Sequence, residues 1–293
     1  MKTKHTRVGL GVLCGLLGIT RQGWYKNHQR ETKAALEAEL IVQLVRDVRL
    51  TQPRVGTRKL LAHLGQTLAR NDIHIGRDAL FDLLRERQML IRRRKSKPKT
   101  TNSNHPYHKY PNLIQYFIPL KANELWVNDI TYVDTEEGFV YLFLMTDAYS
   151  HKIVGYAVAP TLEARWALNA LKMALEQRSD RQTPLIHHSD RGVQYCCHDY
   201  TNCLKNQHNT QISMTENSDP RENAVAERLN GILKTELILH IPKSKEHAQT
   251  YIQQAIHTYN HIRLHSSVNN LTPEQAHLKT GPIPNLWKRK STA

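Results

Sequence analysis

The chain has 293 residues and a formal net charge of +15, with 40% hydrophobic and 23% charged residues. This length fits about two domains, and the composition is that of a folded globular protein, so global disorder is excluded. No apolar run reaches the roughly 18 residues that a membrane-spanning helix needs, and the basic start lacks the cleavage site of a signal peptide.

The positive charge is confined to the first part of the chain. Residues 1–111 hold 23 Lys and Arg against 8 Asp and Glu, whereas residues 112–293 hold 18 of each. A one-sided basic excess is typical of proteins that bind a polyanion, and nucleic acid is the first candidate. A basic, solvated surface without such a partner is the alternative.

The amino-terminal part is predicted to be helical. Residues 1–30 hold two short helices around a Gly-Ile-Thr turn, which indicates either a helix-turn-helix-like segment or a plain helical hairpin. Residues 31–91 hold three more, the first over Glu31–Leu50 with Leu36 and Leu40 on its apolar face. We interpret 31–91 as a helix-turn-helix DNA-binding domain, with a helical scaffold that makes no groove contact as the alternative. Its candidate DNA contacts are Arg58, Lys59 and Arg77.

Residues 92–123 read as a basic, extended linker. The segment has no apolar periodicity and opens on a run of positive charge that suits a phosphate backbone. A passive, solubilising linker is the alternative. The candidate phosphate contacts are Arg92, Arg93, Arg94, Lys95 and Lys97.

From residue 124 the pattern changes to strands and helices. Three strands, a helix, a strand, a helix, a strand and a helix follow in that order, which predicts a mixed five-stranded sheet with helices on both faces. We therefore expect an α/β domain over 124–240 and a helical extension over 241–293. The expected strands are Leu125–Val133, Phe139–Met145, Lys152–Val158, Pro184–His188 and Gln211–Thr215.

Three acidic residues fall where chemistry is expected. Asp129 lies inside the first strand, where a charge is costly to bury without a partner. Asp190 follows the short fourth strand, and sites form at the carboxyl ends of such strands. Glu227 lies in the last helix of the domain, on a polar stripe with Asn223 and Lys234.

These three residues are carboxylates, and the sequence lacks the His and Cys spacings of a zinc site. Such a set of ligands suits Mg²⁺ or Mn²⁺. Two such ions can stabilise the attacking and leaving oxygens of an in-line phosphoryl displacement. Taken one at a time, each acid has a plainer interpretation as a turn or surface residue. Asp147 is predicted to cap a turn rather than to bind metal. His187 and His188 lie shortly before Asp190. They are either structural histidines or contacts of the site.

Six segments resemble one family when they are taken in order. They are Gly15-Leu-Leu-Gly-Ile-Thr-Arg-Gln-Gly-Trp-Tyr, Pro53-Arg-Val-Gly-Thr-Arg-Lys-Leu, Trp126-Val-Asn-Asp-Ile-Thr-Tyr, His188-Ser-Asp-Arg-Gly-Val-Gln-Tyr, Glu222-Asn-Ala-Val-Ala-Glu-Arg and Tyr259-Asn-His-Ile-Arg-Leu-His. In order and spacing the chain resembles the second-frame (OrfB) transposases of IS3-family insertion sequences, within the DDE transposase and retroviral integrase superfamily.

The resemblance implies an RNase H-like core and a catalytic, metal-binding triad of Asp129, Asp190 and Glu227. It implies two Mg²⁺ or Mn²⁺ ions, cleavage of one DNA strand at each end of the element by metal-activated water, and attack of the freed 3′-hydroxyl on another phosphodiester. Lys234 resembles the basic residue that contacts the terminal DNA, and His188 and Asn223 are candidates for a supporting role.

The expected partners follow from that resemblance. They are double-stranded DNA of the terminal repeats and of the target, further copies of the chain bound to DNA, and an upstream-frame OrfA protein or fusion; no membrane is involved. The expected location is the bacterial cytoplasm, at the nucleoid. Two other functions stay open: a non-catalytic repressor derived from such an element, and an RNase H-like nuclease that cleaves without joining.

Overall fold

The computed structural model describes residues 9–91, 106–207, 209–216 and 223–286. Backbone contacts divide the chain into two units, residues 1–50 with 60–90 and residues 51–59 with 91–293. The larger unit is built on a five-stranded sheet in the order β3-β2-β1-β4-β5. Its strands are β1 (Leu125–Thr135), β2 (Gly138–Asp147), β3 (Ile153–Ala159), β4 (Leu185–Ser189) and β5 (Thr210–Met214).

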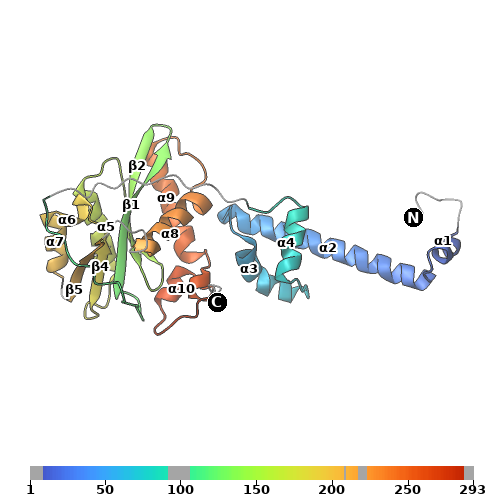
Figure 1. Cartoon of the computed structure of the whole chain (residues 1–293). Coiled ribbons are helices and arrows are strands. Elements are labelled where there is room, and N and C mark those ends of the chain that lie inside the picture. The colour runs from blue at the N-terminus through green and yellow to red at the C-terminus, as the bar shows by residue number, and fades with distance from the viewer. Residues whose placement is uncertain (1–8, 92–105, 208, 217–222, 287–293) are drawn as a thin grey trace. The chain divides into compact units, whose positions relative to one another are not determined.

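Both kinds of strand pairing occur in this sheet. The first three strands pair antiparallel, and β4 pairs parallel with both β1 and β5. Helices cover both faces: α5 to α7 lie on one side of the sheet and α8 to α10 on the other (Figure 1). The expected mixed five-stranded sheet is therefore confirmed. The helices are α5 (Ala164–Gln177), α6 (Val193–Cys196), α7 (His198–Lys205), α8 (Ala224–Ile232), α9 (Lys245–His261) and α10 (Pro273–His277).

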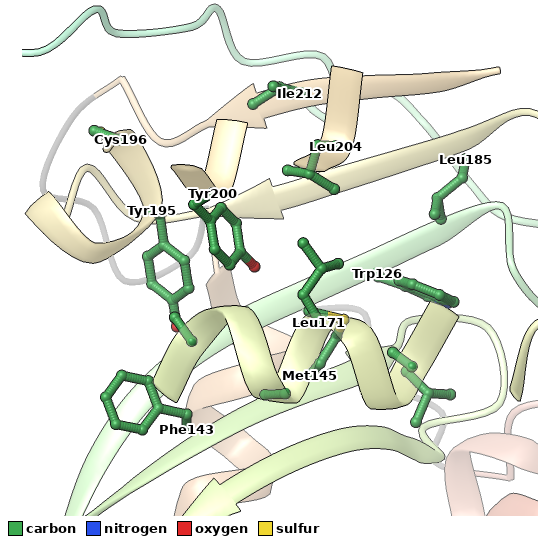
Figure 2. Close-up of a cluster of buried hydrophobic side chains, with 14 of the residues drawn as sticks. Trp126, Phe143, Met145, Leu171, Leu185, Tyr195, Cys196, Tyr200, Leu204 and Ile212 are labelled. Carbon is green, nitrogen blue, oxygen red and sulfur yellow. The ribbon is translucent and has the colours of Figure 1, made fainter. Parts of the chain in front are cut away.

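Alternation along the strands gives the sheet a separate apolar core on each face. On one face Trp126 and Phe143 pack with Leu171 of α5 and Tyr200 of α7 (Figure 2). On the other face Val133, Val140, Leu142 and Leu144 pack with residues of α8 and α9. Fully burying one such side chain is worth about 1.5–3 kcal/mol, so the two cores hold the sheet and its helices together.

The smaller unit differs from its prediction in one helix. In place of two helices separated near residue 30, α2 runs unbroken over Arg21–Thr51, and the expected boundary between residues 30 and 31 falls inside it. Only Ile41, Val42 and Val45 of this helix are buried, whereas Leu36 is 68% exposed. The expected apolar face therefore serves as core only in its second half.

The remaining helices of this unit are short. They are α1 (Leu10–Leu16), α3 (Thr57–Arg70) and α4 (Arg77–Glu86), with α3 and α4 beside the second half of α2 (Figure 1). Their buried leucines include Leu60 and Leu80. An ion pair joins Arg87 to Glu39 of α2 at 2.9 Å. Among the described residues, no helix has both the length and the apolar composition that crossing a membrane requires.

Candidate active site

The register of two parallel strands places Asp129 beside Asp190. In the β1–β4 pair, Val127 lies opposite His188. Two residues further along each chain stand Asp129, still inside β1, and Asp190, directly after β4. Both carboxylates therefore lie at the same level, at the carboxyl end of β4, where open α/β sheets form their sites.

The buried Tyr195 phenol responds to the charge of both carboxylates. Burial raises its pKa well above the usual range, and Tyr200, Asp190 and Asp129 raise it further. Asp129 itself is 2% exposed, whereas Asp190 is partly exposed and accepts a hydrogen bond from the Gly192 amide at 3.0 Å.

The third acid arrives on α8, which is bound to β1 by two asparagines. Asn230 Nδ2 donates to Asp129 Oδ2 at 2.6 Å, and Asn223 Nδ2 donates to the Asn128 carbonyl at 2.9 Å. Glu227 lies between these two on the helix, four residues after one and three before the other, and is partly buried. Because residues three and four apart share a helix face, Glu227 is on the side of α8 that meets β1.

The opposite side of α8 is apolar, as expected. Leu229 and Ile232 are buried in the core cluster that α8 shares with α9 and the sheet. The helix then continues into a π-helical turn, η2 (Leu233–Leu237). Turns of this kind are rare and often occur at functional sites. The local sequence thus commits one face of the helix to the core and turns Glu227 and the asparagines toward β1.

The atoms at this site that could bind a metal ion are oxygens. The side-chain oxygens of Asn223 and Asn230 are buried without a hydrogen-bond partner, close to Asp129. Carboxylate and amide oxygens are the ligands that hard divalent cations prefer. A bound Mg²⁺ keeps several water molecules, and such oxygens can also accept hydrogen bonds from those waters. Within the described ranges, however, no three His, Cys, Asp or Glu side chains are grouped closely enough to share one ion. The donor chemistry fits a divalent cation, but the acids do not form a closed ligand set.

The two histidines before Asp190 belong to the buried framework. His188 Nδ1 is 2.8 Å from Ser213 Oγ on β5. His187 Nε2 is 2.8 Å from the Tyr200 hydroxyl and 2.8 Å from Asn128 Nδ2. Burial, with the neighbouring His188, lowers the pKa of His187 to about 3, so this ring is neutral near pH 7. These three contacts join β4 to β5, α7 and β1 next to the carboxylates.

Asp147 caps the turn after β2, as the sequence predicts. It is fully buried, and its carboxylate accepts hydrogen bonds from the Ser150 amide at 2.8 Å and from the Asn123 amide at 2.7 Å. Ser150 Oγ in turn is 2.9 Å from His277 Nδ1 of α10. The carboxylate is occupied in joining the turn to the carboxyl-terminal helix.

The expected DNA-contact residues are placed unevenly. Arg58 and Arg77 are exposed on α3 and α4, and Arg77 pairs with Asp78 at 2.8 Å. Lys59, which groups with the larger unit, lies 3.5 Å from Glu236, and burial lowers its pKa to about 8. It is therefore a poorer candidate for DNA contact than its neighbour Arg58. Arg92, Arg93, Arg94, Lys95 and Lys97 fall outside the described residues.

Comparison with known proteins places the larger unit in a defined group. Two family models, both described as "Integrase core domain", match residues 119–220 and 208–273. The chain is 35% identical over 271 residues to an IS600 insertion-element protein of Shigella sonnei, covering 89% of this chain and 96% of that protein. It is 31% identical over 279 residues to the transposase InsF of IS3A from Escherichia coli, covering 93% and 95%.

Among solved structures, the catalytic core of the HTLV-2 integrase in complex with magnesium is similar. The match has a TM-score of 0.43 and 19% identity, and it covers 55% of this chain and 99% of that one.

Proposed function

The chain belongs to the IS3 family of DDE-type transposases, and from this premise we propose that it cleaves and joins DNA strands at the ends of a bacterial insertion sequence. The observation that carries the proposal is the shared register of Asp129 and Asp190, with Glu227 brought to the same strand by α8. The three acids come from distant parts of the chain, and we propose that they act together.

We assign metal binding to Asp129, Asp190 and Glu227. Two divalent ions bound there, Mg²⁺ or Mn²⁺, would supply positive charge to the attacking and leaving oxygens of the phosphoryl group. Asn230 orients the Asp129 carboxylate, and the Gly192 amide orients that of Asp190. In each step one P–O bond forms to water or to a 3′-hydroxyl as the bond to the leaving 3′-oxygen breaks. The nucleophile gives up its proton and the leaving oxygen gains one.

The partner of this chemistry is double-stranded DNA, bound through the basic first part of the chain. We propose that residues 31–91 grip the DNA, with Arg58 and Arg77 contacting phosphates, and that Lys234 holds a phosphate near Glu227. Joining two ends needs two sites or repeated use of one, so we expect several copies to assemble on DNA. An upstream-frame OrfA protein or fusion completes recognition of the ends, and the reaction takes place at the nucleoid in the bacterial cytoplasm.

The test uses a labelled duplex made from the terminal repeat that flanks the gene. The chain, with and without the upstream frame fused to it, is incubated with Mg²⁺ or Mn²⁺, and the products are resolved on a denaturing gel. We expect shortened strands and longer, joined strands, both absent with Asp190→Asn. The matched control is Asp199→Asn, an exposed aspartate nine residues further on, which retains activity.

Other products would overturn the proposal. Cleaved strands that are never joined would identify a nuclease. Binding without any product, even with the upstream frame present, would identify a repressor. Activity that survives Asp190→Asn would remove this residue from the site.

A further inference from the structure

Two aromatic side chains on the β1–β2 hairpin face solvent. Tyr132 is 43% exposed and Phe139 is 47% exposed, and their ring centroids are 6.0 Å apart. Phe139 in turn meets the edge of Tyr141 at 5.3 Å, and Tyr141 packs on the core beside α5. The two exposed rings therefore form a surface strip that contacts the core through Tyr141.

The strip is linked to the candidate active site by Lys234. Tyr132 is three residues after Asp129 on the same strand, so the two side chains leave opposite faces of β1, Tyr132 on the face of Tyr141 and α5 and Asp129 on the face of α8. Lys234, seven residues after Glu227, places Nζ 4.1 Å from the centroid of the Tyr132 ring. A lysine from the helix of one candidate metal ligand thus covers an aromatic ring from the strand of another.

The edge of β1 is not shared with another strand at this level. The β1–β4 pairing extends only over Leu125–Val127, so from Asn128 onward β1 pairs with β2 alone. At this edge α8 takes the place of a strand, with Asn223 Nδ2 donating to the Asn128 carbonyl, and Lys234 lies further along over Tyr132. The route from the carboxylates to the exposed rings therefore runs past Lys234.

We propose that Tyr132 and Phe139 form a stacking platform for an unpaired nucleobase of the DNA strand at the active site, with Lys234 holding the adjacent phosphate. The inference rests on the proposed function, because it takes the bound polymer to be DNA. Aromatic rings combined with a nearby cation are the usual means of binding single-stranded DNA, since every base has a face that can stack.

The charges around the strip favour a base over a duplex backbone. Asp134 is exposed and lies opposite Phe139 in the hairpin register, so a phosphate chain passing over Phe139 would meet a carboxylate. A neutral base meets no such repulsion. Bases inside a duplex are stacked on each other and cannot reach a ring, so the base bound here must have left the helix.

Lys234 gives the platform two states. Its ammonium group lies on the Tyr132 ring without DNA, a cation–π contact that also shields the ring from water. A phosphate is a stronger partner for that ammonium group, so DNA draws the lysine aside and frees the ring face for the base.

The experiment uses the full chain carrying Asp190→Asn, so that bound DNA stays intact. The probe is 2-aminopurine, a fluorescent adenine analogue, placed either at the terminal position of the strand or ten base pairs inside the duplex. We expect the chain to quench the terminal probe and not the internal one. Tyr132→Leu and Phe139→Leu each remove the quenching and weaken binding of a 3′-overhang by at least about tenfold, while binding of a blunt duplex is unchanged.

Two variants control for general effects. Tyr132→Phe keeps the ring and retains the quenching, and Tyr116→Leu removes a tyrosine that is 88% exposed but lies outside the strip, with no effect. Quenching that persists in both leucine variants would overturn the inference. So would equal weakening on blunt and overhang DNA, or a change of oligomeric state with quenching intact, which would make the strip a contact between copies.

Failure of this inference is distinct from failure of the proposed function. Without Asp190→Asn, a chain that neither cleaves nor joins DNA refutes the function. A chain that joins strands normally with Tyr132→Leu refutes only the platform.

Discussion

Asn230 donates a hydrogen bond to Asp129 across 101 residues of sequence, with 2.6 Å between Nδ2 and Oδ2. Both residues are buried, and the bond joins the helix of Glu227 to the central strand of the sheet. A hydrogen bond to a charged group in a buried setting is strong and directional. It holds the Asp129 carboxylate in one orientation, and it makes Asn230 a positioning residue.

Asn230→Ala is therefore expected to lower the rate of strand cleavage by about 10- to 100-fold, because groups that orient metal ligands have effects of that size. The concentration of Mg²⁺ needed for half-maximal cleavage should rise as well. Thr235→Ala, which alters only a hydroxyl bonded within the same helix, is the control. A loss of stability with an unchanged Mg²⁺ requirement would show that Asn230 serves the fold alone.

Glu236→Gln is expected to destabilise the larger unit. Glu236 and Arg263 form a two-pronged ion pair at 2.9 and 3.0 Å, and Arg263 is 2% exposed. Removing the carboxylate charge leaves the buried Arg263 uncompensated. That costs about 3–5 kcal/mol for a fully buried pair, and we expect a smaller loss here because Glu236 is partly exposed. Urea unfolding at pH 7 measures the difference, with Glu176→Gln on the exposed side of α5 as the control. Equal unfolding free energies for wild type and Glu236→Gln would contradict the argument.

The same pair predicts a pH dependence. Burial raises the pKa of the Glu236 carboxyl, but the attraction and hydrogen bonds of Arg263 and Lys59 outweigh it, so the net pKa lies below the ordinary value of 4.5. A lowered carboxyl pKa stabilises the fold above the ordinary value, and that stabilisation is lost as pH falls through the lower folded value. The stability gap between wild type and Glu236→Gln should thus be full at pH 7 and shrink as pH falls below 4.5. A gap that stays constant down to pH 3 would rule out this linkage.

Asp147→Asn separates a structural acid from a metal ligand. Because the Asp147 carboxylate accepts two backbone amides and the Ser150 hydroxyl, the change should cost about 1–3 kcal/mol of unfolding free energy. The Mg²⁺ dependence of cleavage should stay at its wild-type value. A shift in that dependence, measured by titrating Mg²⁺ at a temperature where the variant is folded, would instead make Asp147 a ligand.

Gly155→Ala tests how tightly β3 packs on α5. A Cβ at this position would stand 2.2 Å from the Ala170 carbonyl oxygen, so strand and helix must separate. Overpacking of this kind costs about 1–3 kcal/mol or more, which should lower the midpoint of thermal unfolding. Gly231→Ala is the matched control in α8, where the added carbon meets nothing within 4 Å. It should raise stability by about 0.5–1 kcal/mol, since alanine favours helix.

Much of the sheet could be read from the sequence because its strands are short, apolar and separated by turn residues. Asp129 stood out as a charge inside an apolar strand, and the helix stripe of Asn223, Glu227 and Lys234 followed from the helical period. The contacts of this polar stripe could not be predicted, because helical periodicity does not reveal which distant strand the helix packs against. The bond from Asn230 to Asp129 needed the fold.

Other features left little trace in the sequence. The continuity of α2 was missed because the stretch around residue 30 is polar and lacks apolar periodicity, so it looked like a break. Helical periodicity alone places Leu36 on the apolar face, yet its side chain is 68% exposed among the described residues. Tyr132 had no signal either, since an aromatic residue in a strand is most often core. Lys234 contacts the Tyr132 ring at a level of β1 where the pairing with β4 has already ended.

The shared register of Asp129 and Asp190 also bears on how such a chain can diverge. Everything between these residues, including β2, β3 and α5, can lengthen or shorten at its loops without moving either carboxylate, because each is counted from the β1–β4 pairing and not along the chain. A slip of β1 by one residue would be fatal, because it would turn Asp129 to the other face and present Asn128 or Ile130 instead. Insertions in the loops between Asp129 and Asp190 should therefore be tolerated. A change in the pairing of Leu125–Val127 with β4 should not be.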